Sequence, residues 1–225
     1  MIVKTKEDVF SIMGNFYGNA HWRSAVERGE TEEHLRLIVE ILDQINALGY
    51  HFSNLHRLTD HEDNRFIPIV LDYIHRYGKE VIGLLSAFQY RSYYTYTPDL
   101  IALYKKPEYA DFRWDIGNAL VNIRHKKYVP QYLEIVNDPA YGSNPCLVME
   151  ILCMFRVKEA LPRLLELYER YPDVWRWNLL KHSHRFNDPV ILSYIEPYLT
   201  CNDGEYRQMA KKAWEKLTAL ETEMQ

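Results

Sequence analysis

The sequence predicts an all-α protein in which antiparallel helix pairs stack into a right-handed α-α superhelix, that is, an α-solenoid. Three observations lead to this prediction. Apolar residues recur at three- and four-residue steps, prolines near helix starts return at a regular interval, and no segment alternates polar and apolar residues long enough to make a strand. We expect the 225 residues to form a single solenoid domain, with an irregular helical cap at 1–65 followed by helix pairs over 66–218.

The predicted cap is irregular because a terminal repeat has one face exposed to water. Its clearest helix is expected at 31–48, where Thr31 suits the N-cap and Gly49 the end. The apolar stripe of this helix consists of Leu35, Ile38, Leu42 and Ile45. The cap is also acidic, with seven Lys and Arg against eleven Asp and Glu.

Prolines set the repeat that follows the cap. The four that matter are Pro68, Pro98, Pro130 and Pro162. They stand 30, 32 and 32 residues apart, and each begins an apolar segment, where the missing N–H of a first-turn proline costs nothing. The predicted pairs are 66–90, 97–124, 127–156, 158–186 and 188–218.

The second helices of three pairs share an opening pattern, in which an acidic cap is followed by an aromatic residue and an arginine. The matching positions are Asp111 with Arg113, Asp173 with Arg176, and Asp203 with Arg207. Arg176 and Arg207 are 31 residues apart, and Arg113 and Arg176 are 63 apart, which is two repeats. The intervening pair begins its second helix at Ser143–Cys146, which keeps a capping start but has no arginine.

The last pair resembles a HEAT repeat. The matching residues are Asp188, Pro189, Ile191, Leu192, Ile195, Leu199, Asp203, Arg207, Ala210, Ala213 and Leu217, with Tyr206 in place of the usual valine. The likeness is fair at 158–186 and weaker at 97–156. It implies a HEAT-like (armadillo-type) stack with a ladder between repeats, formed by Asp173, Arg176, Asp203 and Arg207. Because such solenoids include scaffolds, adaptors and DNA glycosylases, the resemblance specifies architecture better than function.

Composition narrows the classes of function. The net charge of −4 and a pI near 6.1 argue against nucleic acid as the main partner. The first ten residues lack the apolar run of a signal peptide, and no stretch approaches 18 uncharged apolar residues, so we expect no membrane segment. Three cysteines without CxxC spacing fit a reducing compartment, and the expected location is the cytoplasm.

The richest candidate binding segment runs from Trp175 to Arg185. In a solenoid the second helices line the concave face, and Trp and Arg dominate binding hot spots. One interpretation is a groove for an acidic peptide or a phosphate backbone, built from Trp177, Lys181, His184 and Arg185. The other is a core helix packed between repeats. Adjacent residues cannot share a helix face, so at least one of Trp175, Arg176 and Trp177 should be exposed.

Two further segments are candidate contact sites. Trp114 and Asp115 stand two repeats earlier, and HEAT-like DNA glycosylases hold a damaged nucleotide with aromatic and acidic residues. The tyrosine-rich segment 90–97, with Tyr93 and Tyr94, suits an interface, or else closes a seam with its hydroxyls bonded to backbone.

Motifs for catalysis or cofactors are missing. The spacing of His51, His56 and His61 rotates successive side chains by about 140° on a helix, so one helix cannot offer all three to a metal. Cys146 and Cys153 are expected to be small core residues. The sequence therefore favours a non-catalytic binding protein without cofactors, which holds a protein or peptide on its concave face. A HEAT-like DNA glycosylase and a bacterial toxin-immunity or inhibitor protein remain the alternatives.

Overall fold

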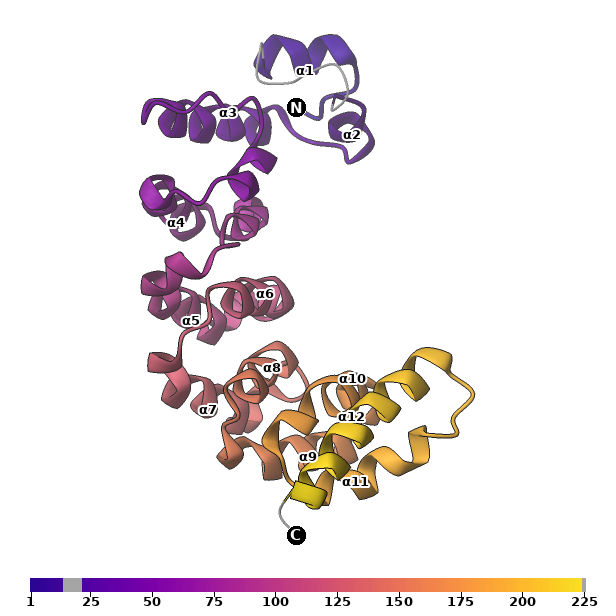
Figure 1. Cartoon of the computed structure of the whole chain (residues 1–225). Helices are drawn as coiled ribbons and strands as arrows, with labels where there is room; N and C mark the ends of the chain where they lie inside the picture. Colours follow the sequence, from indigo (N-terminus) through magenta and orange to yellow (C-terminus); the bar gives the residue numbers. More distant parts are fainter. Residues whose placement is uncertain (14–21, 224–225) are drawn as a thin grey trace. The chain divides into compact units, whose positions relative to one another are not determined.

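The computed structural model describes residues 1–13 and 22–223, with side chains described for 1–13 and 25–219. Gly14 and Gly18, whose spacing predicts a turn between two short helices, lie outside the described residues. Over the described ranges the chain is helical and contains no β-strand, apart from an isolated bridge between Ile2 and Thr31. The prediction of an all-α chain is therefore confirmed (Figure 1). The contacts divide the chain into two compact units, unit 1 at 1–95 and unit 2 at 96–225.

In its described part, unit 1 contains four α-helices interrupted by 3₁₀ helices. The α-helices are α1 (Lys6–Met13), α2 (Trp22–Glu27), α3 (Glu32–Asn46) and α4 (Ile67–Tyr77). The 3₁₀ helices are η2 (Leu55–Asp60), η3 (Asn64–Phe66), η4 (Gly78–Ala87) and η5 (Arg91–Tyr96), the last of which reaches the boundary of the unit. The described part of the segment 1–65 thus holds both α-helices and 3₁₀ helices.

Helix α3 has the start and end that its sequence predicts. The Thr31 hydroxyl accepts a hydrogen bond from the N–H of His34 at 3.1 Å, which satisfies one of the free donors of the first turn. Gly49 follows the helix with φ +96°, a conformation that side chains rarely adopt. The predicted stripe faces inward, because Leu35, Leu42 and Ile45 are fully buried.

The pair predicted at 66–90 departs from two regular helices. Pro68 lies in the first turn of α4, as expected. Gly78 then takes φ +57° and ends the α-helix, and the chain continues as the 3₁₀ helix η4 with non-helical angles at Val81. A glycine at positive φ followed by a kink explains why the second element is not an α-helix.

Unit 2 contains eight α-helices in its described part. They are α5 (Thr97–Lys105), α6 (Arg113–Ile123), α7 (Val129–Asn137), α8 (Cys146–Phe155), α9 (Leu161–Arg170), α10 (Pro172–His182), α11 (Val190–Ile195) and α12 (Gly204–Glu223). Short 3₁₀ helices connect them: η6 (Pro107–Phe112), η7 (Lys126–Tyr128), η8 (Pro139–Tyr141), η9 (Lys158–Ala160), η10 (Ser183–Phe186) and η11 (Glu196–Tyr198). Each of the four pairs predicted over 97–218 contains two α-helices.

The helices of unit 2 contact one another in a regular order. Within each pair the two helices pack together, and the second helices α6, α8, α10 and α12 also contact one another in succession (Figure 1). Gly117 lets α6 and α8 approach closely, because an added Cβ would lie 3.0 Å from the side chain of Leu147. The buried core includes Trp175, Leu179 and Leu180 of α10.

Helix starts in unit 2 follow the proline prediction more closely than the capping prediction. Pro98, Pro130 and Pro162 all lie in a first helical turn. Asp203 caps α12 by accepting hydrogen bonds from the N–H groups of Glu205 and Tyr206. Other starts differ from the prediction. Asp173 lies inside the first turn of α10, whose N-cap is Tyr171, because Pro172 already occupies a first-turn position. Helices α6 and α8 likewise begin without a side-chain cap.

Candidate functional site

Helix α10 has one face in the core and one face on the surface. Trp175 is 0% exposed, and the side-chain amide of Asn178 donates a hydrogen bond to the Cys146 carbonyl at 2.7 Å, which holds α10 against α8. Trp177 is 36% exposed. The prediction that at least one residue of this triplet is exposed is therefore confirmed. The buried contacts fix the rotation of α10, so Trp177 and Lys181, spaced by four residues, lie along its accessible side, and Arg185 follows in η10.

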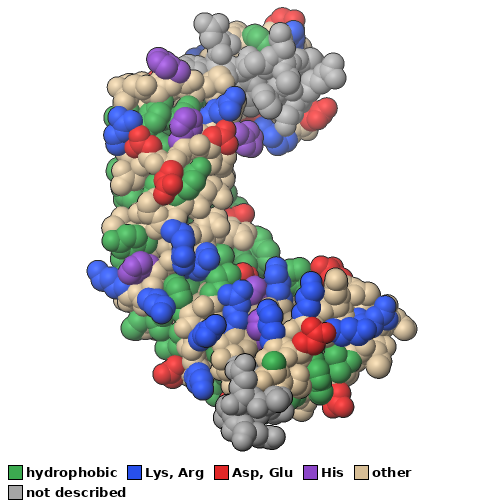
Figure 2. Space-filling view, in the orientation of Figure 1, with side chains coloured by type: hydrophobic (Ala, Val, Ile, Leu, Met, Phe, Trp, Pro, Cys, Tyr) green, Lys and Arg blue, Asp and Glu red, His purple; other side chains and the backbone are tan. Residues whose placement is uncertain are grey.

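A groove of about 390 Å³ lies between this side of α10 and helix α12. Its lining residues include Trp177, Lys181, Arg185, Gln208, Lys212 and Lys216. The α12 residues are also spaced by four, so two parallel rows of side chains face the same space. Figure 2 shows Lys and Arg side chains gathered over α10 and α12. The α10–α12 groove brings together Trp177, Lys181, His184 and Arg185, which are half of the residues that the sequence predicts to contact a partner.

The cations of the α10–α12 groove have no carboxylate partners. Among the residues whose side chains are described, Lys181, Arg185, Lys212 and Lys216 form no ion pair with Asp or Glu. The ammonium group of Lys181 lies over the Trp177 ring, 4.4 Å from its centroid, which is a cation–π contact. Glu205 is the acidic residue that lines the groove. The groove therefore carries an excess of positive charge toward solvent.

A second hollow, of about 570 Å³, adjoins the groove and shares three of its residues. The shared residues are His184, Arg185 and Lys216, and Arg156 adds a further cation. We call this space the Arg156 hollow. Burial, which is the largest cause, and the charges of Lys216, Arg185 and Arg156 together lower the pKa of His184 to about 4. Three cations thus surround one imidazole, which is uncharged at neutral pH.

A buried pair lies beneath the groove. His182 of α10 is 2% exposed, and its Nε2 lies 3.5 Å from a carboxylate oxygen of Glu150 on α8. Burial lowers the pKa of His182 to about 3, and Lys181, Arg185 and His184 act in the same direction. Burial also raises the pKa of Glu150, while Lys181, Arg124 and Arg185 oppose that rise. Burial disfavours the charged form of Glu150, so the attraction of this carboxylate for a protonated His182 is weakened. Burial therefore affects the pKa of His182 more than Glu150 does.

The remaining predicted contact residues lie apart from the groove. Trp114 is 59% exposed on α6 and Asp115 beside it is exposed, but neither lines one of the described hollows of unit 2. Tyr94 is exposed in unit 1. Tyr93 is buried, and its hydroxyl donates to the His61 carbonyl at 2.8 Å. Its inclusion among the surface contact residues is wrong, because the segment folds inward to satisfy the hydroxyl, the alternative that the sequence left open.

The predicted ladder residues make mostly local polar interactions. Arg176 pairs with Asp173 at 2.7 Å within α10, and Arg207 donates to the Cys201 carbonyl at 3.0 Å. The contact of Arg176 with the following pair is through aromatic rings, since its guanidinium lies 5.1 Å from the ring centroid of Tyr206. Arg113 contacts the ring of Tyr141 in the same way, at 4.6 Å. Arginine–tyrosine contacts therefore recur between successive helix pairs.

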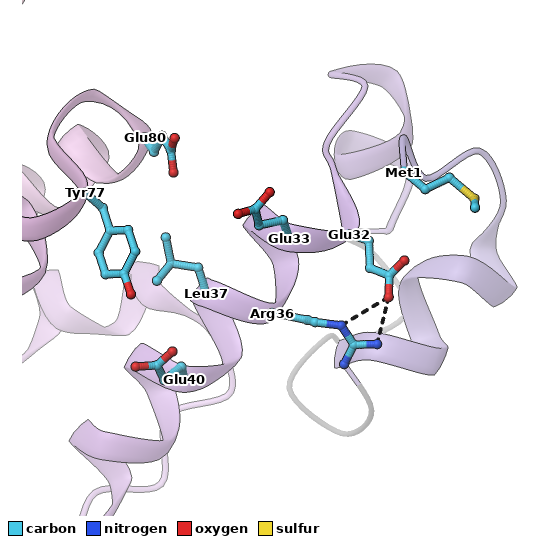
Figure 3. Close-up of a pocket in the computed structure, with 8 residues that line it drawn as sticks. All are labelled: Met1, Glu32, Glu33, Arg36, Leu37, Glu40, Tyr77 and Glu80. Carbon is cyan, nitrogen blue, oxygen red and sulfur yellow. Dashed lines mark hydrogen bonds and ion pairs between the residues drawn. The ribbon is translucent and has the colours of Figure 1, made fainter.

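Unit 1 has a hollow of opposite charge. It measures about 410 Å³ and is lined by the carboxylates of Glu32, Glu33, Glu40 and Glu80, with Leu37, Tyr77, Arg36 and Met1 (Figure 3). The Arg36 guanidinium pairs with Glu32 at 2.8 Å, as the dashed lines in Figure 3 mark. Glu40 accepts a hydrogen bond from the Tyr73 hydroxyl at 2.6 Å. We call this space the acidic hollow of unit 1.

The sequence did not predict that residues of α12 line the groove or that Arg156 lines the adjoining hollow. A usable signal exists, because the repeat separation of 31 residues between Arg176 and Arg207 also relates Lys181 to Lys212 and Arg185 to Lys216. Extending the repeat register from the structural arginines to their neighbours would have placed these cations opposite one another. Arg156 has no such signal, because it follows α8 in a left-handed conformation that depends on how the helix ends.

Other kinds of site find little support in the described part of the chain. No three His, Cys, Asp or Glu side chains there converge as metal ligands, and no helix there is long and apolar enough to cross a membrane. Cys146 and Cys153 are buried, as expected of core residues, and burial raises the pKa of both thiols. Comparison with models of known protein families, with curated proteins and with solved structures gave no match.

Proposed function

We propose that this chain is a cytoplasmic, non-catalytic binding protein of the HEAT-like repeat kind, whose α10–α12 groove holds an acidic segment of a protein partner. The regular order of contacts among α6, α8, α10 and α12 supports a solenoid. The observation that carries the function is that the groove cations form no ion pair with a carboxylate among the described side chains. Four positive side chains facing one groove raise the local concentration of a negatively charged ligand and favour its binding.

The composition of the groove supports a peptide over a nucleic acid. One face of the Trp177 ring is covered by the ammonium group of Lys181, which leaves less of the ring for stacking on a base. Glu205 lines the same groove and would repel a phosphate backbone running along it. A peptide can place its acidic residues against Lys212 and Lys216 and a neutral residue near Glu205, so its charge can match the groove at both ends.

The proposal is tested with a fluorescein-labelled peptide of eight glutamates around a central serine, using fluorescence anisotropy at low salt. The double variant Trp177→Ala/Arg185→Ala should bind this peptide about tenfold more weakly, since it removes an aromatic contact and a cation from the groove. Its helicity, measured by circular dichroism, should equal that of the unchanged protein. The matched control is Trp114→Ala/Lys211→Ala, which removes the same kinds of side chain outside the groove and should leave affinity unchanged.

The outcomes separate the candidate functions. Equal binding by both double variants would refute the groove as the peptide site, and unfolding of Trp177→Ala/Arg185→Ala would show that these residues are structural. A labelled single-stranded oligonucleotide that binds more tightly than the peptide would favour the nucleic-acid alternative. A lysine-rich peptide that binds would favour the toxin-immunity alternative, which the acidic hollow of unit 1 supports by its charge.

A further inference from the structure

The cations of unit 2 are most concentrated where the α10–α12 groove meets the Arg156 hollow. Three elements meet there: Arg156 follows α8, Arg185 lies in η10, and Lys216 lies in α12. All three charges act on His184, and the Lys216 ammonium lies 3.2 Å from its Nε2. Arg156, Arg185 and Lys216 line the Arg156 hollow together with His184, so the three cations lie close to the imidazole.

The protonation of His184 follows from its neighbours. A lysine ammonium group only donates hydrogen bonds, so Nε2 of the uncharged imidazole must accept from Lys216 and the ring proton lies on Nδ1. This Nδ1 is buried and has no hydrogen-bond partner among the described residues. The imidazole therefore adds no positive charge at neutral pH, and it cannot balance the cations around it.

The backbone around the hollow is also unusual. Arg156 and Asn187 are the non-glycine residues of the described chain that have positive φ, at 58° and 53°, and both line the Arg156 hollow. Asparagine adopts this conformation readily, whereas arginine is much less common there. Helix α8 thus ends in a conformation that normally selects glycine, yet carries a long cationic side chain at that point.

We infer that Arg156, Arg185 and Lys216, which line one hollow with the uncharged His184, form a binding site for a phosphate dianion, carried by a phosphorylated residue of the peptide that the groove holds. This inference rests on the proposed function of the groove. One carboxylate supplies a single negative charge, whereas a phosphomonoester near neutral pH carries close to two, with three acceptor oxygens. The two arginines can each pair with phosphate oxygens through two N–H groups, and Lys216 adds a point charge.

The occupant is a phosphopeptide because the dense positive charge is local. Arg156, Arg185 and Lys216 line a single hollow, while Glu205 and the covered ring of Trp177 line the groove beside it. A polynucleotide would bring further phosphates along the groove toward Glu205. A peptide with one phosphorylated residue places its dianion in the Arg156 hollow and its uncharged or singly charged residues along the groove.

The test compares two labelled nonapeptides of eight glutamates with a central serine or a central phosphoserine. The phosphoserine peptide should bind about tenfold more tightly, as expected for added charge-assisted hydrogen bonds. The variant Arg156→Asn removes a cation of the hollow that does not line the groove, so it should lose most of this gain while keeping its affinity for the serine peptide within about twofold. The matched control is Lys211→Gln, which removes an exposed cation of α12 outside the hollow and should keep the gain.

A second readout follows His184 directly by NMR. Bound phosphoserine peptide should raise the pKa of His184 above about 4, because the dianion compensates the cations that disfavour imidazole protonation. The serine peptide should raise it less. Inorganic phosphate should compete more strongly with the phosphoserine peptide than with the serine peptide.

The outcomes distinguish this inference from the proposed function. Equal affinity for the two peptides, or a gain that survives in Arg156→Asn, would overturn the phosphate site while leaving the peptide groove in place. A single-stranded oligonucleotide that binds more tightly than the phosphopeptide and loses that binding in the same variant would overturn the phosphopeptide and favour a polynucleotide. If neither peptide binds at all, the proposed function fails with it.

Discussion

The charged side chains of unit 1 and those of the α10–α12 groove in unit 2 are balanced differently. In unit 1, Arg36 and Arg76 each pair with a carboxylate four residues earlier, at 2.8 and 2.7 Å, and Arg65 pairs with Asp63 at 2.6 Å. In unit 2, the groove cations Lys212 and Arg185 have no such partner among the described residues. Surface charge that is balanced locally supports solubility and small gains in stability. Charge that is left unbalanced on two facing helices costs stability, and an external anion can compensate it.

The acidic hollow of unit 1 shows why charge alone does not define a site. Its carboxylates are partly used within the fold, since Glu32 pairs with Arg36 and Glu40 accepts from Tyr73. The groove of unit 2 has fewer internal uses for its charges: Lys181 contacts the Trp177 ring, and Lys216 contacts His184. Three expectations about stability follow from this contrast. The groove side chains should be dispensable for folding, an added positive charge should destabilise unit 2, and removal of a groove cation should not lower the free energy of unfolding.

The largest expected effect separates the two faces of α10. Trp175→Ala should lower the free energy of unfolding by about 3 to 5 kcal/mol, because it leaves a cavity at a fully buried position. Trp177→Ala should lower it by about 1 kcal/mol or less, because its ring is already partly in water. Urea unfolding followed by circular dichroism measures both. Similar losses for the two variants would mean that Trp177 belongs to the core and the groove is not a free surface.

Lowering the pH provides the second test, because burial and neighbouring cations disfavour protonation of His182 in unit 2. The pKa of His182 is about 3 in the folded protein and near 6.5 in the unfolded chain, so between these values the unfolded chain binds a proton that the folded protein does not. Stability from this residue is therefore fully present above pH 6.5 and falls as the pH drops toward 3. The loss is about 2 kcal/mol between pH 7 and pH 5.

The measurement compares urea unfolding at pH 7 and pH 5 for the unchanged protein and for His182→Gln. The variant lacks the titrating group, so its free energy of unfolding should change less with pH by about the same 2 kcal/mol. Groups elsewhere in the chain contribute equally to both proteins and cancel in the difference. An identical pH dependence in the two proteins would show that His182 titrates normally and that the region beneath the groove tolerates charge.

The sequence predicts the helix pairs well because their signals are local. Apolar spacing defines the buried stripe of α3, and first-turn prolines mark the starts of α4, α5, α7 and α9. The 3₁₀ conformation of η4 is harder to predict, because it follows from a positive φ at Gly78 and a kink at Val81 rather than from apolar spacing.

The site could be predicted only on one helix. Trp177, Lys181 and Arg185 are suggestive as residue types in a single segment, whereas Lys212 and Lys216 look like ordinary surface lysines until α12 is packed on α10. The sequence predicts Tyr93 at the surface, because a tyrosine-rich segment does not show which hydroxyls donate hydrogen bonds to backbone carbonyls. Pairing between distant segments is set by packing, and only the repeat register carries a trace of it in the sequence.

The smallest expected effect is a difference in sign between the units. Arg36→Gln in unit 1 should lower the free energy of unfolding by about 0.5 kcal/mol, because it breaks an i,i+4 ion pair with Glu32. Lys212→Gln in unit 2 should leave it unchanged or raise it by a few tenths of a kcal/mol, because it relieves repulsion among unpaired cations. Glutamine has nearly the helix propensity of arginine and lysine, so the two substitutions do not differ through backbone preference.

Urea unfolding at low salt measures the free energy of unfolding of both variants, and the difference between them should shrink in concentrated salt, which screens charges on the surface. If Lys212→Gln costs as much as Arg36→Gln, Lys212 has a structural role in unit 2 and the contrast between balanced and unbalanced charge no longer holds.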